Sequence, residues 1–156
     1  MRLVKASGSP GTGEAPISGP HFANVPSTLL LVSTASLTEF GRVCGLPVPA
    51  DRFRANLEVD INPPFAEMEW PLGSGVQVGR VAFEAAGHCV RCQAVDVDPE
   101  AGSASKPSLL SALATMQQSD GKGPTFGVLV RATEMAQEIA SQELPMLKVG
   151  DAVCTR

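Results

Sequence analysis

The chain alternates short apolar segments with Gly- and Pro-rich turns, and this pattern restricts its fold more than any other feature. Runs of alternating or continuous apolar residues bounded by such turns predict strands. They lie at residues 29–32, 52–60, 76–85 (as one strand or two), 93–98, 126–131 and 147–153. Many short strands with few helices are typical of a closed or nearly closed β-barrel. We therefore expect a mainly β fold (α+β): a barrel with a few short helices.

Two helices are expected beside the strands. The hydroxyl groups of residues 33–36 can cap a helix at residues 37–43, and Ser108 can cap a second one at about residues 109–118. Residues 134–142 fit either a helix or a strand. Residues 1–27 are rich in Gly, Ser and Pro, which predicts a flexible segment containing a candidate strand at residues 1–4. The barrel domain is expected at residues 28–156.

Composition excludes several classes of protein. With 156 residues and 44% hydrophobic residues, the chain has the size of one folded domain. Its net charge of −4 provides no general field for nucleic acid, although a local basic pocket for a small phosphate stays open. The longest apolar run, at residues 29–32, is far too short to cross a membrane. Four cysteines without a recognisable signal peptide predict free thiols in a reducing compartment, and we expect a cytoplasmic protein.

The segment at residues 87–93 is the strongest candidate for chemistry, because Cys89 and Cys92 enclose Arg91. A guanidinium beside a thiol favours the thiolate form, which suits nucleophilic attack, metal ligation or anion binding. Spacing alone leaves other interpretations open. A structural zinc site would need a second pair of ligands, a thioredoxin-like pair would open a helix, and both cysteines could be packed without a role. His88 either tunes the thiols or is a bystander.

A second candidate lies at Arg52 and Arg54, which an extended strand would point to one face, with Asn56 continuing that face. Guanidinium groups in register suit an anion such as phosphate, whereas the alternative is an ordinary solvated face. Glu67 and Glu69 fit surface or capping positions.

The order of several short motifs resembles the MOSC domain, the C-terminal domain of eukaryotic molybdenum cofactor sulfurases, which also occurs in amidoxime-reducing molybdenum proteins. The resemblance covers about residues 29–153. The motifs are Arg52-Phe53-Arg54-Ala55-Asn56, Phe65-Ala66-Glu67-Met68-Glu69-Trp70, Gly79, Cys89-Val90-Arg91-Cys92-Gln93, Asp98-Pro99-Glu100-Ala101-Gly102, Phe126-Gly127 and Val149-Gly150-Asp151. Arg91-Cys92-Gln93 resembles the sulfurases more than the amidoxime reducers.

The resemblance implies a β-barrel domain that binds the pterin-based molybdenum cofactor. It assigns Cys92 as the thiolate on molybdenum, a metal that takes soft ligands, with Cys89 beside it as a second catalytic candidate. It assigns further cofactor contacts to Arg54, Asn56 and Val90, with Arg91 beside the thiolate. The other expected contacts are Arg52, on the cofactor's phosphate, and the Ser33 and Ser36 loop.

In the sulfurases, a pyridoxal-phosphate domain takes sulfur from cysteine and carries it as a persulfide. The C-terminal domain presents the cofactor, whose terminal oxo ligand is replaced by sulfido, and the product activates xanthine dehydrogenase- and aldehyde oxidase-type enzymes. This chain is too short to include a pyridoxal-phosphate domain. The resemblance therefore implies a piece of a sulfurase, or a protein that works with a separate cysteine desulfurase. An amidoxime-reductase-like enzyme and a metal-free persulfide carrier are the alternatives.

Overall fold

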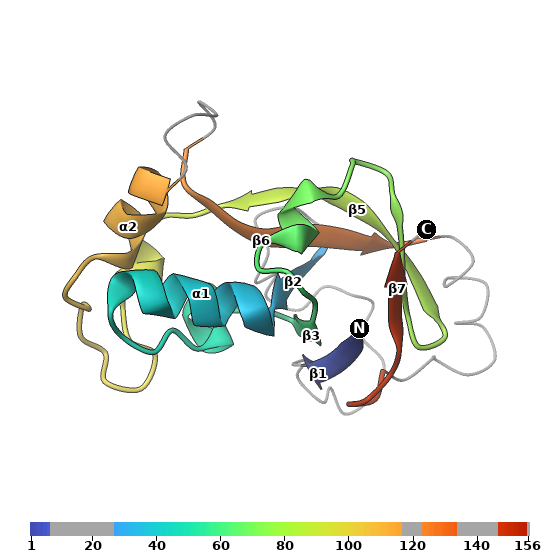
Figure 1. Ribbon diagram of the computed structural model, residues 1–156, viewed down its shortest axis with the longest axis horizontal. Coiled ribbons are helices and arrows are strands. Elements are labelled where there is room, and N and C mark those ends of the chain that lie inside the picture. The colour runs from blue at the N-terminus through green and yellow to red at the C-terminus, as the bar shows by residue number, and fades with distance from the viewer. Residues whose placement is uncertain (7–26, 117–122, 134–146, 156) are drawn as a thin grey trace.

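The computed structural model of the chain describes residues 1–6, 27–116, 123–133 and 147–155. The strands are β1 (Arg2–Ala6), β2 (Leu29–Ser33), β3 (Leu57–Asp60), β4 (Gly75–Val78), β5 (Val81–Val90), β6 (Thr125–Ala132) and β7 (Val153–Thr155). The helices are α1 (Thr34–Cys44) and α2 (Leu109–Met116), with short 3-10 helices η1 (Ala50–Phe53), η2 (Ala66–Glu69) and η3 (Gln93–Asp96). In Figure 1, α1 and α2 lie toward one end of the molecule, and β7 lies toward the other.

The seven strands form one sheet in the order β1-β3-β2-β6-β5-β4-β7, which curls until its two edges meet. The β2 and β3 strands are parallel, while the other neighbouring pairs are antiparallel. Between the edges, the amide of Leu3 donates to the carbonyl of Asp151 at 2.8 Å, and that of Val153 donates to Met1 at 3.0 Å. The sheet is therefore a nearly closed barrel, as the sequence predicts.

The barrel divides the apolar residues into two cores, because side chains alternate between the faces of a strand. The inner core, inside the barrel, takes residues from every strand, including Leu3, Leu57, Val76, Phe83, Val128 and Val153. The outer core lies between the sheet and the helices, where Leu30, Val32 and Leu129 meet Phe40 of α1 and Leu109 of α2. The helical layer therefore covers one part of the barrel, and the candidate residues for chemistry at the end of β5 lie beside it.

Several expected elements are confirmed. Residues 29–32 lie in β2, 76–85 in β4 and β5, and 126–131 in β6. The α1 helix begins after its N-cap Ser33, whose side chain accepts from the amide of Ser36, and α2 follows Ser108, whose hydroxyl accepts from the Ser111 amide at 3.1 Å. The candidate strand at residues 1–4 overlaps β1, which begins at Arg2. The boundary at residues 27/28 stays a prediction, and residues 134–142 lie outside the described part.

Three strand predictions are wrong in whole or in part. Residues 52–60 do not form one strand, because η1 ends at Phe53, Arg54 adopts a left-handed conformation with φ of 55°, and β3 begins only at Leu57. Within residues 93–98 the chain forms η3 up to Asp96, and Val97 makes only an isolated bridge with Ala104. Within residues 147–153 the chain first makes a turn, in which the Asp151 amide donates to the Lys148 carbonyl, and β7 begins only at Val153.

Candidate functional site

Cys92 lies just beyond the end of β5, where the chain leaves the sheet and enters η3. Its side chain is exposed, as are the neighbouring Gln93 and Ala94, while the next residue, Val95, is buried in the outer core. The thiol therefore lies on a short surface loop between two anchored points. An exposed thiol is accessible to a metal, an electrophile or a sulfur donor.

Cys89 has the opposite environment, being 4% exposed in the outer core. Gly87, with φ of 143°, lies at a bulge where β5 advances from Ala85 to Gly87 while β6 advances by one residue. This extra residue turns the side chains that follow to the other face of the sheet. Burial raises the pKa of the Cys89 thiol, and the charge of Arg91 offsets this only in part. The expectation of a lowered thiol pKa is therefore wrong for Cys89.

The side chain of Arg91 turns into the protein. Its Nε and Nη2 donate to the carbonyl of Phe126 on β6, and its Nη1 donates to the carbonyl of Phe53 at 3.2 Å. The guanidinium carbon lies 5.2 Å from the centre of the Phe53 ring, which stacks on Phe126 with 4.1 Å between centroids. Arg91 thus joins the ends of β5, β6 and η1. Burial lowers its pKa, and the thiols of Cys89 and Cys92 act in the opposite direction.

Arg52 is also directed inward, and this corrects the expectation that it shares an open strand face with Arg54. Its side chain is 6% exposed and pairs with Asp98 at 2.7 Å. Its Nη1 donates to the carbonyl of Asp96 at 3.1 Å and contacts the hydroxyl of Ser105 at 3.4 Å. Arg52 therefore anchors the segment that follows Cys92, and its guanidinium is not arranged as a surface clamp for an anion.

Arg54 and Asn56 differ in how far their side chains are exposed. Arg54 is exposed and directly follows Phe53, whose carbonyl binds Arg91, so its backbone lies close to the Arg91 guanidinium. Asn56 is half-buried, and its Oδ1 accepts from the Leu30 amide at 2.8 Å. That oxygen is committed to the link between β2 and the start of β3.

Ser33 and Ser36 are fully buried and are bonded to the protein. The Ser33 hydroxyl donates to the Ile61 carbonyl at 2.9 Å, and the Ser36 hydroxyl donates to Oε2 of Glu67 at 3.0 Å. Oε1 of Glu67 accepts from the Ser33 amide at 3.3 Å, and the Ser36 hydroxyl accepts from the Phe65 amide at 2.8 Å. Glu67 is 0% exposed, so the expectation of a surface or capping residue is wrong.

Glu67 is the residue that sequence reasoning missed. No sequence signal distinguishes it from the exposed Glu69 two positions later. Burial raises the pKa of Glu67, and the hydrogen bond from Ser36 is the first of those that lower it. A buried carboxyl thus holds the corner between β2 and α1.

Val90 and His88 lie on the exposed side of the last part of β5, with Val90 51% exposed. His88 is exposed and pairs with Val128 of β6 in the strand register. Among the described residues, no three His, Cys, Asp or Glu side chains gather as a set that could hold a metal ion. The described surface thus offers Cys92 as a single exposed thiol ligand at this loop.

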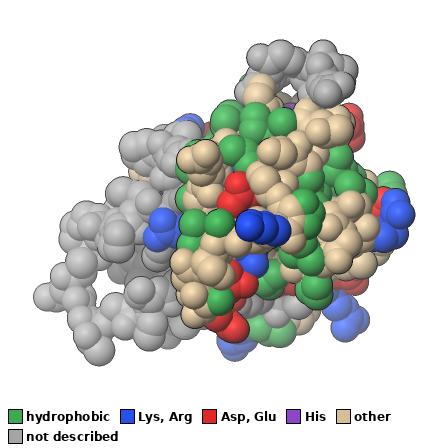
Figure 2. Space-filling view, turned by 90° about the vertical axis from the view of Figure 1, so that its left-hand side faces the viewer, with side chains coloured by type: hydrophobic (Ala, Val, Ile, Leu, Met, Phe, Trp, Pro, Cys, Tyr) green, Lys and Arg blue, Asp and Glu red, His purple; other side chains and the backbone are tan. Residues whose placement is uncertain are grey.

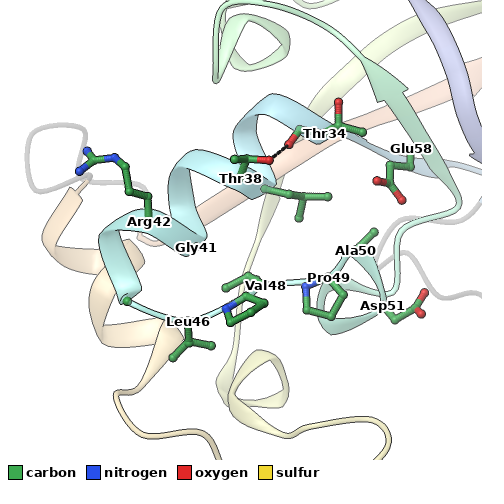
Figure 3. Close-up of a pocket in the computed structure, with 13 residues that line it drawn as sticks. Thr34, Thr38, Gly41, Arg42, Leu46, Val48, Pro49, Ala50, Asp51 and Glu58 are labelled. Carbon is green, nitrogen blue, oxygen red and sulfur yellow. Dashed lines mark hydrogen bonds between the residues drawn. The ribbon is translucent and has the colours of Figure 1, made fainter.

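A hollow of about 800 Å³ lies elsewhere, between α1 and the segment from Leu46 to Asp51. Figure 3 shows Arg42 at one end of it and Asp51 and Glu58 at the other, with the Thr38 hydroxyl donating to the Thr34 carbonyl inside the helix. Its walls, as far as the described residues define them, include none of the predicted site residues. On the described surface, the hollow and the exposed thiol of Cys92 therefore lie in different places.

The surface charge agrees with the sequence. On the face shown in Figure 2, Lys and Arg side chains are scattered among acidic and hydrophobic ones, and no broad basic patch is visible. No helix in the described ranges has the length and apolar character needed to cross a bilayer.

Comparison with known proteins identifies the family. The family model of the MOSC domain matches residues 18–154, so the chain belongs to the MOSC domain family. A molybdenum cofactor sulfurase of Drosophila mojavensis is 27% identical over 156 residues, which cover 98% of this chain and 19% of that protein. The human mitochondrial amidoxime-reducing component 1 is 29% identical over 134 residues, covering 81% of this chain and 36% of that protein.

A solved structure, the YUAD protein from Bacillus subtilis, has the same fold with a TM-score of 0.52 at 17% identity, covering 80% of this chain and 61% of that one. The chain thus spans only about a fifth of the sulfurase from Drosophila mojavensis. The family and its relation to molybdenum cofactor sulfurases and amidoxime-reducing proteins are established by these matches.

Proposed function

We propose that this chain is the cofactor-binding domain of a molybdenum cofactor sulfurase, which holds the molybdenum cofactor through Cys92. In this role the cofactor is a substrate, whose terminal oxo ligand is exchanged for sulfido. The sulfur comes from a pyridoxal-phosphate cysteine desulfurase domain or protein, and the product serves xanthine dehydrogenase- and aldehyde oxidase-type enzymes. The observation that carries the proposal is the single exposed thiol at the end of β5 in a MOSC domain with sulfurase relatives.

The donor set fits such a cofactor in part. Cys92 is a soft and accessible ligand, which suits molybdenum. Arg54 is exposed and has its backbone close to Phe53 and Arg91, so it is the guanidinium we assign to the cofactor's phosphate. The exposed Val90, two residues before Cys92, offers backbone and apolar contact. Asn56 offers its Nδ2 protons, while its Oδ1 already accepts from the Leu30 amide.

Other residues in the predicted set support the site without facing a ligand. Arg52, Ser33 and Ser36 are buried and bonded to protein groups, and Arg91 directs its donors at two backbone carbonyls. We therefore assign cofactor contact to Cys92, Arg54, Val90 and Asn56. The remaining contacts would come from groups beyond the described residues or from a partner.

The test is the molybdenum and pterin content of protein purified from a host that makes the cofactor. We expect up to about one molybdenum per chain in the wild type, none in Cys92→Ser, and a partial reduction in Cys89→Ser. Cys154→Ser is the matched control, because Cys154 is also exposed but lies on β7. Equal losses in Cys92→Ser and Cys154→Ser would refute the ligand assignment. A wild type without molybdenum that still takes a persulfide on Cys92 would favour a metal-free sulfur carrier.

An amidoxime-reductase-like activity is the second candidate, and the similarity to the human amidoxime-reducing component 1 favours it. In this case the cofactor on Cys92 would supply the electron-transfer chemistry for reducing N-hydroxylated substrates, with electrons from haem or flavin partners. Cofactor-loaded protein with a chemical electron donor should then reduce a model amidoxime. Robust turnover is incompatible with a role limited to presenting the cofactor for sulfur exchange.

A further inference from the structure

The Cys92 loop is fixed at both ends by buried or partly buried arginines. Only Cys92, Gln93 and Ala94 are exposed, while Arg91 before them and Val95 after them are held by the protein. Such a short exposed segment has few conformations when both ends are anchored.

Arg91 anchors the side through which the chain enters the loop. Its amide donates to the Pro124 carbonyl at 2.8 Å, and its side chain bridges the carbonyls of Phe126 and Phe53. The stacked Phe53 and Phe126 rings form the floor under the guanidinium. These contacts tie three segments that are distant in sequence to the residue next to Cys92.

Arg52 anchors the side through which the chain leaves the loop. It binds the Asp96 carbonyl and pairs with the Asp98 carboxylate. Asp96 in turn accepts from the Ser108 hydroxyl at 2.9 Å and from the Leu110 amide at 3.1 Å, which attaches the same segment to the start of α2. The carboxylate of Asp98 also accepts from the amides of Glu100 and Ala101.

We propose that Arg91 and Arg52 are positioning residues, which hold the Cys92 thiol in one place from the two ends of its loop, and that neither guanidinium contacts the ligand of Cys92. The first part rests on the contacts above, and only the link to a cofactor rests on the proposed function. The planar guanidinium is required, because its several donors reach carbonyls on different segments at once. A lysine keeps the charge but offers a single nitrogen.

The experiment compares Arg91→Lys with Arg131→Lys by native-state hydrogen exchange. Arg131 is a matched control, because it lies on β6 in an exposed pair with Glu84 at 3.4 Å. The reporters are the amides of residue 91 and of Val95, which donate to Pro124 and Cys92. We expect at least tenfold faster exchange of these two amides in Arg91→Lys, with core amides such as those of Leu31 and Val130 unchanged within about twofold.

A functional readout accompanies this one. Arg91→Lys should retain at least threefold less molybdenum than Arg131→Lys, and Arg52→Lys should produce a similar loss with faster exchange at residues 97–98. Unchanged exchange at residues 91 and 95 would overturn the positioning role. Equal acceleration throughout the barrel would also overturn it, because Arg91 would then only stabilise the fold. If the wild type holds no molybdenum, the proposed function fails, while hydrogen exchange still decides the positioning role.

Discussion

Two corners of the barrel were expected to form one site, and the structure gives them opposite characters. At the end of β5, the chain presents the exposed thiol of Cys92 on a loop held by Arg91 and Arg52. At the end of β2, Ser33 and Ser36 are buried against the carboxyl of Glu67. Polar residues at a strand end are thus available to a ligand only where they are not already bonded to other groups of the protein.

The difference follows from what each corner packs against. The β2 corner begins α1 and is covered by η2, so its polar groups must bond to one another, because an unpaired buried polar group is costly. The β5 corner leaves the sheet after the Gly87 bulge, which buries Cys89 and leaves the next residues at the surface. The β2 corner therefore contributes to the stability of the fold, whereas the β5 corner leaves a thiol exposed at the surface.

Substitution of Glu67 should have the largest effect on stability. Glu67→Ala removes the acceptor for the Ser33 amide and the Ser36 hydroxyl, both buried, and we expect a loss of about 2–3 kcal/mol in the free energy of unfolding. Urea unfolding measures it. Glu69→Ala is the control, because Glu69 is exposed on the same 3-10 helix. Cys92→Ser should change stability by less than about 0.5 kcal/mol, and equal effects at the two corners would contradict the comparison.

The thiols should differ strongly in reactivity. In native protein at pH 8, we expect iodoacetamide to modify Cys92 at least ~100-fold faster than Cys89, because the thiolate is the nucleophile and burial both shields Cys89 and raises its pKa. Peptide mass spectrometry measures each site separately. Cys154 is the exposed control, and Cys44, whose pKa burial also raises, is the buried one. Comparable rates for Cys89 and Cys92 would mean that the bulge does not separate them.

Arg54 should matter for the cofactor but little for the fold. Arg54→Ala is expected to weaken cofactor binding by about 1.5–3 kcal/mol, the usual contribution of a charge-assisted hydrogen bond. Apparent affinity for added cofactor measures this, and Arg80→Ala is the control at another exposed arginine. Ser36→Ala should instead lower stability with a smaller change in affinity per folded molecule. An unchanged affinity in Arg54→Ala would place Arg54 on a solvated face.

Sequence patterns predicted the barrel because its strands carry local signals. The apolar run of β2, its capping Ser33 and the alternation in β4 and β5 record burial directly. The same reasoning failed at residues 52–60. The alternating pattern there includes Arg52, whose side chain is buried in the protein and does not lie on an open strand face. Arg52 finds its partners Asp96 and Asp98 more than forty positions away, and no local pattern contains that information.

The site was predictable in its chemistry and less so in its geometry. The Cys-Val-Arg-Cys segment and the family resemblance indicated Cys92, but spacing could not tell which thiol is exposed, since a single extra residue at Gly87 decides it. The burial of Glu67 was hidden for a related reason. An acidic residue is usually at the surface, and only the folded arrangement supplies the Ser33 and Ser36 donors.

The pH dependence of stability that comes from Glu67 should be the smallest of these effects, and it is the sharpest test of the buried corner at the end of β2. Burial raises its folded pKa above the ordinary value of 4.5, so the folded chain holds the proton more tightly than the unfolded chain. As pH rises through that ordinary value, the unfolded chain loses its proton first, and stability falls until the raised folded pKa has been passed. Above it, the loss is complete and constant.

Glu67→Gln isolates this contribution, because the amide keeps an acceptor oxygen and has no proton to lose. The unfolding free energy of the wild type minus that of Glu67→Gln should therefore decrease as pH rises from about 4 through the raised pKa. Urea unfolding of both proteins at a series of pH values measures the difference. A difference that increases over this range would mean that the charged carboxylate is stabilised at this corner. Such stabilisation would require a cation near Glu67, which the described residues do not provide.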